Sequence, residues 1–470
     1  MTRFVQSSQL AAPAREVFAW HTRPGAFQRL MPPWEKVQIL RQEGIGDGAI
    51  AVLKLGPLQQ TWVARHRDYV EGVQFVDEQL EGPFARWVHT HHFEPRNGAA
   101  CVLEDRIDYE LPLGKLGGAL AGDWFARTLA RTFRYRHATL ANDLERHNSA
   151  PRTPRTIVVS GASGLIGQAL CAFLSTGGHR VKRLVRHAAR GDDEIFWDPA
   201  AGRIDERSLV GVDAVVHLAG AGVADARWSA ARKREIRDSR VLGTTLLATA
   251  LARLPRPPSV MVSASAVGYY GAQAIDVDED SCAGDDFLAE VCVAWEAAAD
   301  PARAAGIRVA HPRLGVVLTP AGGALAKMLP PFKLGLGATP GDGRNQVPWV
   351  ALDDVLGALH FALFHPVLDG AFDVVAPDVV TMSELTQAIG RTLGHPPHLH
   401  VPATALRLAL GEMAQTVLGG ARLHSRRLAA AGFHFAHPTL PAALAHLLGA
   451  DVEGAPDFRS GDAAPNTLPL

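Results

Sequence analysis

The stretch that decides the fold is RTIVVSGASGLIGQALCAFLSTGGHRVKRLVRH, residues 155–187. TIVVS is a short apolar run rich in β-branched residues, and it predicts a buried parallel strand. GASGLIG follows, and the residues after it are apolar at helical spacing. VKRLV then predicts a second strand. This order of strand, glycine-rich loop, helix and strand indicates an α/β fold with a doubly wound parallel sheet.

The glycine-rich loop has the pattern GxxGxxG, in the setting that a dinucleotide-binding fingerprint requires. Glycines let the backbone turn tightly and approach a pyrophosphate, and the following helix N-terminus offers N–H groups and a positive dipole end. We therefore predict that this segment binds the cofactor. The residues expected to do so are Gly161, Ser163, Gly164, Leu165, Ile166 and Gly167.

The second predicted strand ends at Val185 and Arg186, about 20 residues after the glycines. Sites that prefer NAD place an acidic residue here to bind the ribose 2′-hydroxyl. Arginine instead can pair with a 2′-phosphate. We therefore expect the cofactor to be NADP(H).

A further apolar strand is predicted in GVDAVVHLAGAG, residues 211–222, and it ends in small residues. Small side chains at the carboxyl end of a strand let a cofactor lie across the sheet. Leu218, Ala219 and Gly220 are therefore expected to be cofactor neighbours.

Residues 1–147 form a separate module, divided from the rest by a Pro-containing polar linker at 148–156. A strand, short helices, alternating segments such as ARWVHTHHF and a long helical pattern at 119–146 follow one another. This order resembles the START-like polyketide-cyclase and lipid-transport superfamily. The resemblance implies an α+β helix-grip fold with a cavity for a hydrophobic ligand. The aromatic residues that either line that cavity or form an ordinary core are Trp34, Trp62, Phe75, Phe84 and Trp87.

Two histidines in this module, His89 and His91, share one face of a predicted strand. Histidines at this spacing can ligate a metal. In the sequence, no acidic residue or cysteine lies at a spacing from these histidines that is typical of a metal site. We therefore expect a polar spot on the sheet and no metal site.

Several motifs of the second module occur in the order GASGLIG, VDAVVHLAG, SASAVGYYG, HPRLGVVL and KMLPPFKLGLGATPGDGRNQVPWVALDDV. Together they resemble the extended short-chain dehydrogenase/reductase class, and within it the "epimerase family protein" group of NAD-dependent epimerase/dehydratase relatives. The resemblance covers residues 155–449. It implies nucleotide contacts at Glu235, Arg240 and Val317.

In this class a tyrosine acts as general acid or base, a lysine lowers its pKa and a serine orients the substrate oxygen. Ser265 matches the serine, and Tyr270, or alternatively its neighbour Tyr269, is the candidate tyrosine. The usual tyrosine and lysine positions align with Leu288 and Cys292, so both standard residues are missing. Arg240 or a histidine would then have to make Tyr270 acidic.

The remaining boundaries are a cofactor domain with a substrate lobe at 157–400, a small helical domain at 401–450 and a disordered tail at 451–470. In the lobe, Met328, Phe332, Arg344 and Trp349 are candidate ligand contacts, and Asp353 and Asp354 are expected to cap the following helix.

The net charge of −1 gives no reason to expect nucleic acid as a partner. The four cysteines lack zinc spacing, and no stretch reads as a signal peptide or a membrane span. We therefore expect a cytoplasmic protein with a small-molecule substrate.

Two functional hypotheses follow. We favour an NADP(H)-dependent epimerase or oxidoreductase with non-standard acid–base residues. The alternative is a non-catalytic NADP(H)-binding sensor or scaffold whose first module binds an apolar ligand.

Overall fold

The computed structural model describes residues 1–56, 59–112, 115–151, 153–272 and 276–450. The tail at 451–470, expected to be disordered, lies outside these residues. The chain divides into two compact units, Met1–Glu145 and Arg146–Ala450, called here the first and second unit. Each is considered by itself.

The first unit contains one antiparallel sheet with the strand order β1-β7-β6-β5-β4-β3-β2, so that the first strand pairs with the last. Its elements are β1 (Thr2–Leu10), α1 (Ala14–Thr22), α2 (Ala26–Leu30), β2 (Val37–Gln42), β3 (Ile50–Leu55), β4 (Gln60–Val70), β5 (Gln74–Glu81), β6 (Arg86–Arg96), β7 (Ala100–Glu110) and α3 (Lys115–Asn148).

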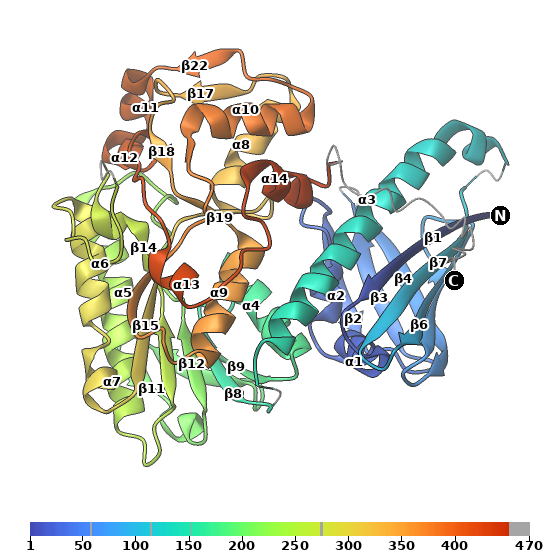
Figure 1. Ribbon diagram of the computed structural model, residues 1–470, viewed down its shortest axis with the longest axis horizontal. Helices are drawn as coiled ribbons and strands as arrows, with labels where there is room; N and C mark the ends of the chain where they lie inside the picture. Colours follow the sequence, from blue (N-terminus) through green and yellow to red (C-terminus); the bar gives the residue numbers. More distant parts are fainter. Residues whose placement is uncertain (57–58, 113–114, 152, 273–275, 451–470) are drawn as a thin grey trace, which may run out of the picture. The chain divides into compact units, whose positions relative to one another are not determined.

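The long helix α3 crosses one face of this sheet (Figure 1). Leu140 and Leu144 of α3 pack with Phe93 and Leu103 of the sheet, and further along Phe133 packs with Trp87. Side chains alternate between faces along a strand, so the apolar residues of β6 and β7 reach this helix from every second position. The helix-grip architecture is thereby confirmed.

The second unit is built on a mostly parallel sheet with the order β11-β10-β9-β8-β12-β13-β15-β14, and β20 also pairs with β15. These strands are β8 (Thr156–Ser160), β9 (Arg180–Val185), β10 (Glu194–Asp198), β11 (Arg203–Ile204), β12 (Ala214–His217), β13 (Val260–Ser263), β14 (Ser265–Ala266), β15 (Arg308–Leu314) and β20 (Gly370–Val374).

Helices cover both faces of the parallel sheet (Figure 1). On one face lie α4 (Leu165–Thr176) and α9 (Leu352–Phe364). The other face carries α5 (Ala230–Ala252) and α7 (Asp300–Ala304), with α6 (Phe287–Ala297) packed on α5. Strands buried on both sides need apolar residues at successive positions, as the TIVVS run provides. The doubly wound α/β fold is confirmed.

A smaller lobe follows β15 and has its own core. Phe332 and Trp349 belong to that core, each 1% exposed, so neither is a ligand contact as the sequence suggested. The lobe and C-terminal region comprise β16 (Val316–Leu318), α8 (Gly323–Lys333), β17 (Ala338–Pro340), β18 (Gln346–Val347), β19 (Trp349–Ala351), β21 (Val380–Thr381), α10 (Met382–Leu393), β22 (Leu399–Val401), α11 (Ala403–Leu410), α12 (Gln415–Leu418), α13 (Arg426–Ala430) and α14 (Leu440–Leu448).

Asp354 does not cap α9, because the N-cap position is Ala351. Its carboxylate is fully buried and accepts the backbone N–H groups of Ala436 and His437, at 2.7 and 3.1 Å, and a guanidinium N–H of Arg146 at 2.8 Å. Asp354 thus fixes the C-terminal segment around residues 436–437 to α9.

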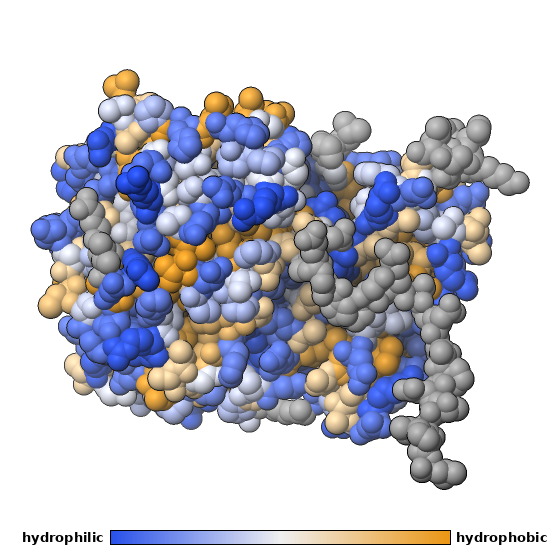
Figure 2. Space-filling view, turned by 45° about the horizontal axis from the view of Figure 1, so that its top comes forward, coloured by the Kyte–Doolittle hydropathy of each residue, from blue (hydrophilic) through white to orange (hydrophobic). Residues whose placement is uncertain are grey.

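The visible surface is mostly polar, with small apolar patches between polar residues (Figure 2). Within the described parts of the chain, none of the helices combines the length and the apolar character needed to cross a membrane.

Candidate functional site

The candidate cofactor site lies where β8 and β12 run side by side in parallel, with Ser160 opposite His217. From β8 the sheet continues through β9 and β10 on one side and through β12 and β13 on the other. This is the point at which the strand order reverses, and doubly wound folds bind their ligands there, outside the carboxyl ends of the strands. The glycine-rich loop after β8 and the small residues after β12 meet at this edge.

The loop after β8 fits a dinucleotide because its glycines have no room for a side chain. Gly161 has φ +67°, and a Cβ there would lie 2.9 Å from the carbonyl carbon of Leu218. A Cβ on Gly167 would lie 2.1 Å from the carbonyl oxygen of Gly161. Gly164 is the N-cap of α4, and no side chain caps this helix. The backbone and the helix N-terminus are therefore left to contact phosphates, as a pyrophosphate cradle requires.

Ser160 holds the two loops of the crevice together, which the sequence did not indicate. Its Oγ accepts the N–H groups of Leu218 and Ala219 at 3.0 and 3.2 Å, and lies 2.7 Å from Nδ1 of His217. Burial lowers the pKa of His217 to about 4, so the ring is neutral. With both serine lone pairs occupied, the hydroxyl donates to Nδ1. Leu218 and Ala219, predicted to be cofactor neighbours, thus lie beside the glycine loop.

Among the residues expected to contact the nucleotide, Arg186 and Glu235 are exposed and Val185 is half-buried. Val185 ends β9, and Arg186 follows it on the surface. Glu235 on α5 is also largely exposed and pairs with Arg232 at 2.7 Å. The structure therefore places Arg186 at the strand end that was predicted, and it ties Glu235 to a neighbouring arginine.

Arg240 is half-buried and shapes the loop after β12. Its guanidinium donates to the carbonyl oxygens of Ala221 and Ile236, at 2.9 and 3.0 Å. A Cβ on Gly220 would lie 3.1 Å from the guanidinium carbon, so the loop backbone passes directly over this side chain. Arg240 therefore supports the backbone of the loop after β12. Val317 lies half-buried on β16, the strand that follows β15.

A polar group of three residues lies at the same edge of the sheet. The hydroxyl of Ser265 donates to Oε1 of Glu296 at 2.7 Å. Arg313, from β15, donates to both oxygens of the same carboxylate, at 2.8 and 2.9 Å. Ser265 was predicted from its place after the strand. Glu296 and Arg313 were not predicted, because they come from α6 and β15, which are distant from Ser265 in the sequence.

Tyr270 is 5% exposed, and its hydroxyl is enclosed by charged partners. It lies 2.9 and 3.0 Å from the two carboxylate oxygens of Asp373 and accepts a hydrogen bond from Arg313 at 2.9 Å. Burial raises the pKa of Tyr270, and the charge of Asp373 raises it further. These contacts are those of a structural tyrosine, opposite to what a general acid needs.

The usual positions of the tyrosine and lysine, Leu288 and Cys292, both lie on α6. A Cβ on Gly268 would lie 3.3 Å from Leu288 and 3.9 Å from the sulfur of Cys292, so these two side chains pack under the turn that carries Tyr270. Burial raises the pKa of Cys292 to about 12, which keeps the thiol protonated. Neither side chain supplies the missing acid–base chemistry.

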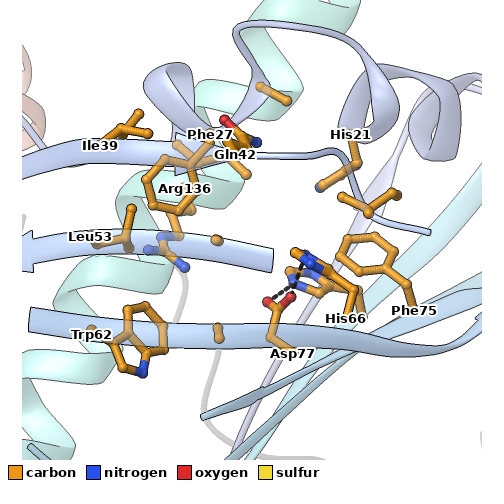
Figure 3. Close-up of a pocket in the computed structure, with 16 residues that line it drawn as sticks. His21, Phe27, Ile39, Gln42, Leu53, Trp62, His66, Phe75, Asp77 and Arg136 are labelled. Atoms are coloured by element: carbon orange, nitrogen blue, oxygen red, sulfur yellow. Dashed lines mark hydrogen bonds and ion pairs between the residues drawn. The ribbon is translucent and has the colours of Figure 1, made fainter. Parts of the chain in front are cut away.

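The first unit contains a pocket of about 80 Å³ (Figure 3). Of the aromatic residues proposed to line a cavity, Trp62 and Phe75 do so. Phe84 and Trp87 instead stack on one another at 4.8 Å within a core cluster, and Trp34 packs against Tyr135. The pocket is lined by His21, Ala26, Phe27, Leu30, Ile39, Gln42, Ile45, Ala51, Leu53, Trp62, Ala64, His66, Phe75, Asp77, His91 and Arg136.

Comparison with known proteins matches the two units to different families. Residues 157–375 match the NAD dependent epimerase/dehydratase family, and residues 10–135 match the polyketide cyclase/dehydrase and lipid transport family. Residues 401–447 match a domain of unknown function, DUF1731. An epimerase family protein of Mycobacterium bovis, Mb2239, is 44% identical over 292 residues, which are 62% of this chain and 96% of the relative. The chain belongs to the epimerase family.

Two solved structures extend the similarity. A nucleoside-diphosphate sugar epimerase from Corynebacterium glutamicum is 34% identical with a TM-score of 0.78, covering 95% of this chain and 90% of its own. The human epimerase family protein SDR39U1 (isoform2), solved with NADPH, is also 34% identical; the match has a TM-score of 0.57 and covers 62% of this chain and 98% of the human one. The first of these relatives therefore spans both units.

Proposed function

We propose that this chain is an NADP(H)-dependent epimerase or oxidoreductase that acts on a small hydroxyl or carbonyl compound. In this proposal Ser265 and Glu296 handle the proton in place of the missing tyrosine and lysine. The observation that carries it is the 2.7 Å hydrogen bond from the Ser265 hydroxyl to Glu296, at the sheet edge that also bears the glycine loop.

The cofactor assignment is supported by three features. The glycine loop after β8 has the space and backbone exposure for a pyrophosphate. Arg186 stands at the end of β9, where a 2′-phosphate would need a positive charge. A relative that covers the second unit was solved with NADPH. Bound NADP(H) would supply or accept a hydride at this edge.

The proton-handling role follows from the direction of the hydrogen bonds. Ser265 is 2% exposed, so this role requires the site to open around it when a substrate binds. Because the Ser265 proton points to Glu296, the serine oxygen then has lone pairs to accept a bond from a substrate hydroxyl. A proton leaving that hydroxyl passes to Ser265 as the serine proton passes to Glu296. Arg313 fixes the carboxylate from its other side. Tyr270 has no comparable role, because its hydroxyl is committed to Asp373 and Arg313.

The first test is native mass spectrometry of the full chain, purified gently, to find a co-purifying nucleotide and any second small molecule. Titration with NADPH and NADH then measures cofactor preference. Turnover is sought with nucleotide sugars, because the Corynebacterium relative is named for such a substrate, and with simple hydroxyl and carbonyl compounds. Failure to bind NADPH would overturn the cofactor assignment.

Once a substrate is found, Ser265→Ala and Glu296→Gln separate the proposed roles. Loss of one general acid–base group costs about 10²–10⁴-fold in rate. We expect a fall of this size in kcat for both variants with an unchanged Kd for NADPH. Tyr270→Phe is the contrasting variant and is expected to keep most of the rate. A full rate in Ser265→Ala would refute the serine–glutamate pair.

The second candidate function is a non-catalytic NADP(H)-binding sensor whose first unit binds an apolar ligand. The observation in its favour is that Leu288 and the protonated thiol of Cys292 occupy the positions of the standard acid–base pair. Tight NADPH binding without substrate-dependent oxidation of NADPH across the panel would favour this candidate.

A further inference from the structure

A cluster of polar residues interrupts the apolar face of the sheet in the first unit. Asp77 comes from β5, and His89 and His91 come from the neighbouring strand β6. The two histidines are 3% and 7% exposed. One ligand atom of each of the three side chains lies within 4.8 Å of the others. We propose that these three residues bind a divalent transition-metal ion at the base of the pocket.

The distances are those expected around a metal ion. Oδ2 of Asp77 lies 3.5 Å from Nδ1 of His89 and 3.3 Å from Nε2 of His91. A charge-assisted N–H···O hydrogen bond would be about 2.7–2.9 Å long. Tetrahedral zinc, with bonds of about 2.0–2.1 Å, holds neighbouring ligand atoms about 3.3 Å apart. The 3.3 Å contact still has hydrogen-bond geometry, but it is long for a charge-assisted one. With the remaining pair of atoms within 4.8 Å, this spacing is compatible with an ion between the three atoms.

A second layer of residues orients the ligands. The ring nitrogens that face away from Asp77, Nε2 of His89 and Nδ1 of His91, lie 2.8 and 2.7 Å from the same oxygen of Asp105. A metal-binding histidine usually directs its other ring N–H to a carboxylate, which fixes the tautomer. Nε2 of His89 makes such a hydrogen bond, whereas Nδ1 of His91 lies beside the same oxygen without hydrogen-bond geometry. The other oxygen of Asp105 contacts His137 at 2.7 Å. Oδ1 of Asp77 lies 2.7 Å from Nε2 of His66 (Figure 3).

Protein hydrogen bonds alone do not satisfy this cluster. Among the residues that the structure describes, Oδ1 of Asp77 and Nδ1 of His91 are buried and close to charged atoms, yet neither has a partner with hydrogen-bond geometry. Two carboxylates, the buried Asp105 and the partly buried Asp77, also require positive charge beside them. A dication between Asp77 and the two histidines provides that charge.

The proposed ion would be open to the pocket. Asp77 and His91 both line it, together with apolar residues such as Leu53 and Phe75 (Figure 3). Three protein ligands and one open position are typical of metal sites that bind a water or a further ligand. We therefore expect the pocket to accept an apolar molecule whose oxygen donor, a carbonyl or carboxylate, completes the coordination of the metal.

The test uses the full chain after treatment with a chelator. Co²⁺ is added as a spectroscopic probe, and equilibrium dialysis with Zn²⁺ followed by elemental analysis gives the stoichiometry. We expect the visible ligand-field absorption of a four- or five-coordinate cobalt ion and about one retained ion for this site. Absence of both the absorption and retained zinc would overturn the proposal and leave protonated histidines as the source of positive charge.

Variants locate the ion. His91→Gln removes a ligand and is expected to weaken Co²⁺ binding by at least about 100-fold, and Asp105→Asn by about 10–100-fold. His92→Gln is the matched control, because it lies on the same strand with its side chain on the opposite face. Equal binding in His91→Gln and His92→Gln would overturn the assignment, whether or not Asp105→Asn folds.

A second group in the second unit needs its own control. Asp353, His437 and His446 also bring ligand atoms within 4.8 Å of one another. His446→Gln is expected to leave the cobalt absorption intact. If His446→Gln abolishes that absorption and His91→Gln does not, the ion belongs to the second unit and the proposal fails.

Discussion

The crevice of the second unit and the polar cluster of the first unit are built in opposite ways. The crevice is made largely of backbone: glycines without room for a Cβ, a helix N-terminus and strand ends. The cluster is made of side chains on a rigid sheet, with six charged or polar groups from four strands and α3 in contact. The first kind of site is sensitive to added volume, and the second is sensitive to lost charge.

The largest effect is expected from adding volume to the crevice. Gly167→Ala places a methyl group 2.1 Å from the carbonyl oxygen of Gly161, so the loop must move. We expect NADPH affinity to fall by about 100-fold, or roughly 2–3 kcal/mol, in a fluorescence titration. Helix propensity favours alanine over glycine, so it does not explain a loss.

Gly122→Ala is the matched control for this substitution. Gly122 lies in α3 of the first unit, and a Cβ there meets nothing within 4 Å. NADPH affinity should be unchanged. Equal affinities for the two variants would mean that the glycine loop does not form the pyrophosphate site.

The next largest effect is expected from removing charge in the cluster. Asp105 is 3% exposed and contacts three histidines. Asp105→Asn should lower the free energy of unfolding of the first unit by about 3 kcal/mol, because breaking a buried charge network leaves its partners uncompensated. The free energy of unfolding is measured by a denaturant titration in which proteolysis reports the unfolded fraction. NADPH affinity should stay within about twofold. An unchanged midpoint would show that the histidines are not held by this charge.

A third prediction concerns pH and the network around Tyr270. Burial, reinforced by the charge of Glu279, raises the pKa of Asp373 to about 7 from an ordinary value of 3.8. The folded protein therefore keeps a proton that the unfolded chain has lost, and this contribution to stability disappears as the pH rises through 7. Relative to Asp373→Asn, the wild type should lose about 1–3 kcal/mol between pH 5 and pH 8.

The measurement is urea unfolding of both proteins across that range. Asn keeps a polar group beside the hydroxyl of Tyr270, so the comparison isolates the titration of the carboxyl group. Parallel pH profiles for the two proteins would show that Asp373 is ionised throughout.

The smallest effect is expected at Arg186. Because this side chain is exposed, its contact with a 2′-phosphate is screened by solvent. Arg186→Ala should weaken NADPH binding by about fivefold and leave NADH binding unchanged. Titrations with both cofactors at low and moderate salt test this. An equal loss for both cofactors would assign Arg186 to the shared part of the nucleotide.

The two sites also differ in how far the sequence predicts them. The crevice was predicted because strand, glycines and helix N-terminus are consecutive, and a spacing rule describes them. The cluster was not, because His89 and His91 meet Asp77 and Asp105 only through pairing of β6 with β5 and β7. The spacing of residues within one strand does not reveal which residues of the neighbouring strands lie opposite them.

The tyrosine illustrates a different limit. Tyr270 follows a strand in the way a catalytic tyrosine would, but β15 and β20 bring Arg313 and Asp373 opposite one another and around its hydroxyl. Whether a side chain points into a crevice or into a core depends on such long-range pairing. For the same reason the sequence does not indicate Glu296, although it is the partner of Ser265.

The pairing of β1 with β7 has a consequence for synthesis of the chain. Thr2 pairs with Tyr109, so the first strand made is completed only by the last strand of its sheet. At ribosomal rates of about 5–20 residues per second, β1 waits roughly 5–20 s for its partner. During that interval its hydrogen-bonding edge is open to other nascent strands, because the pairing partner of β1 is made last in this sheet.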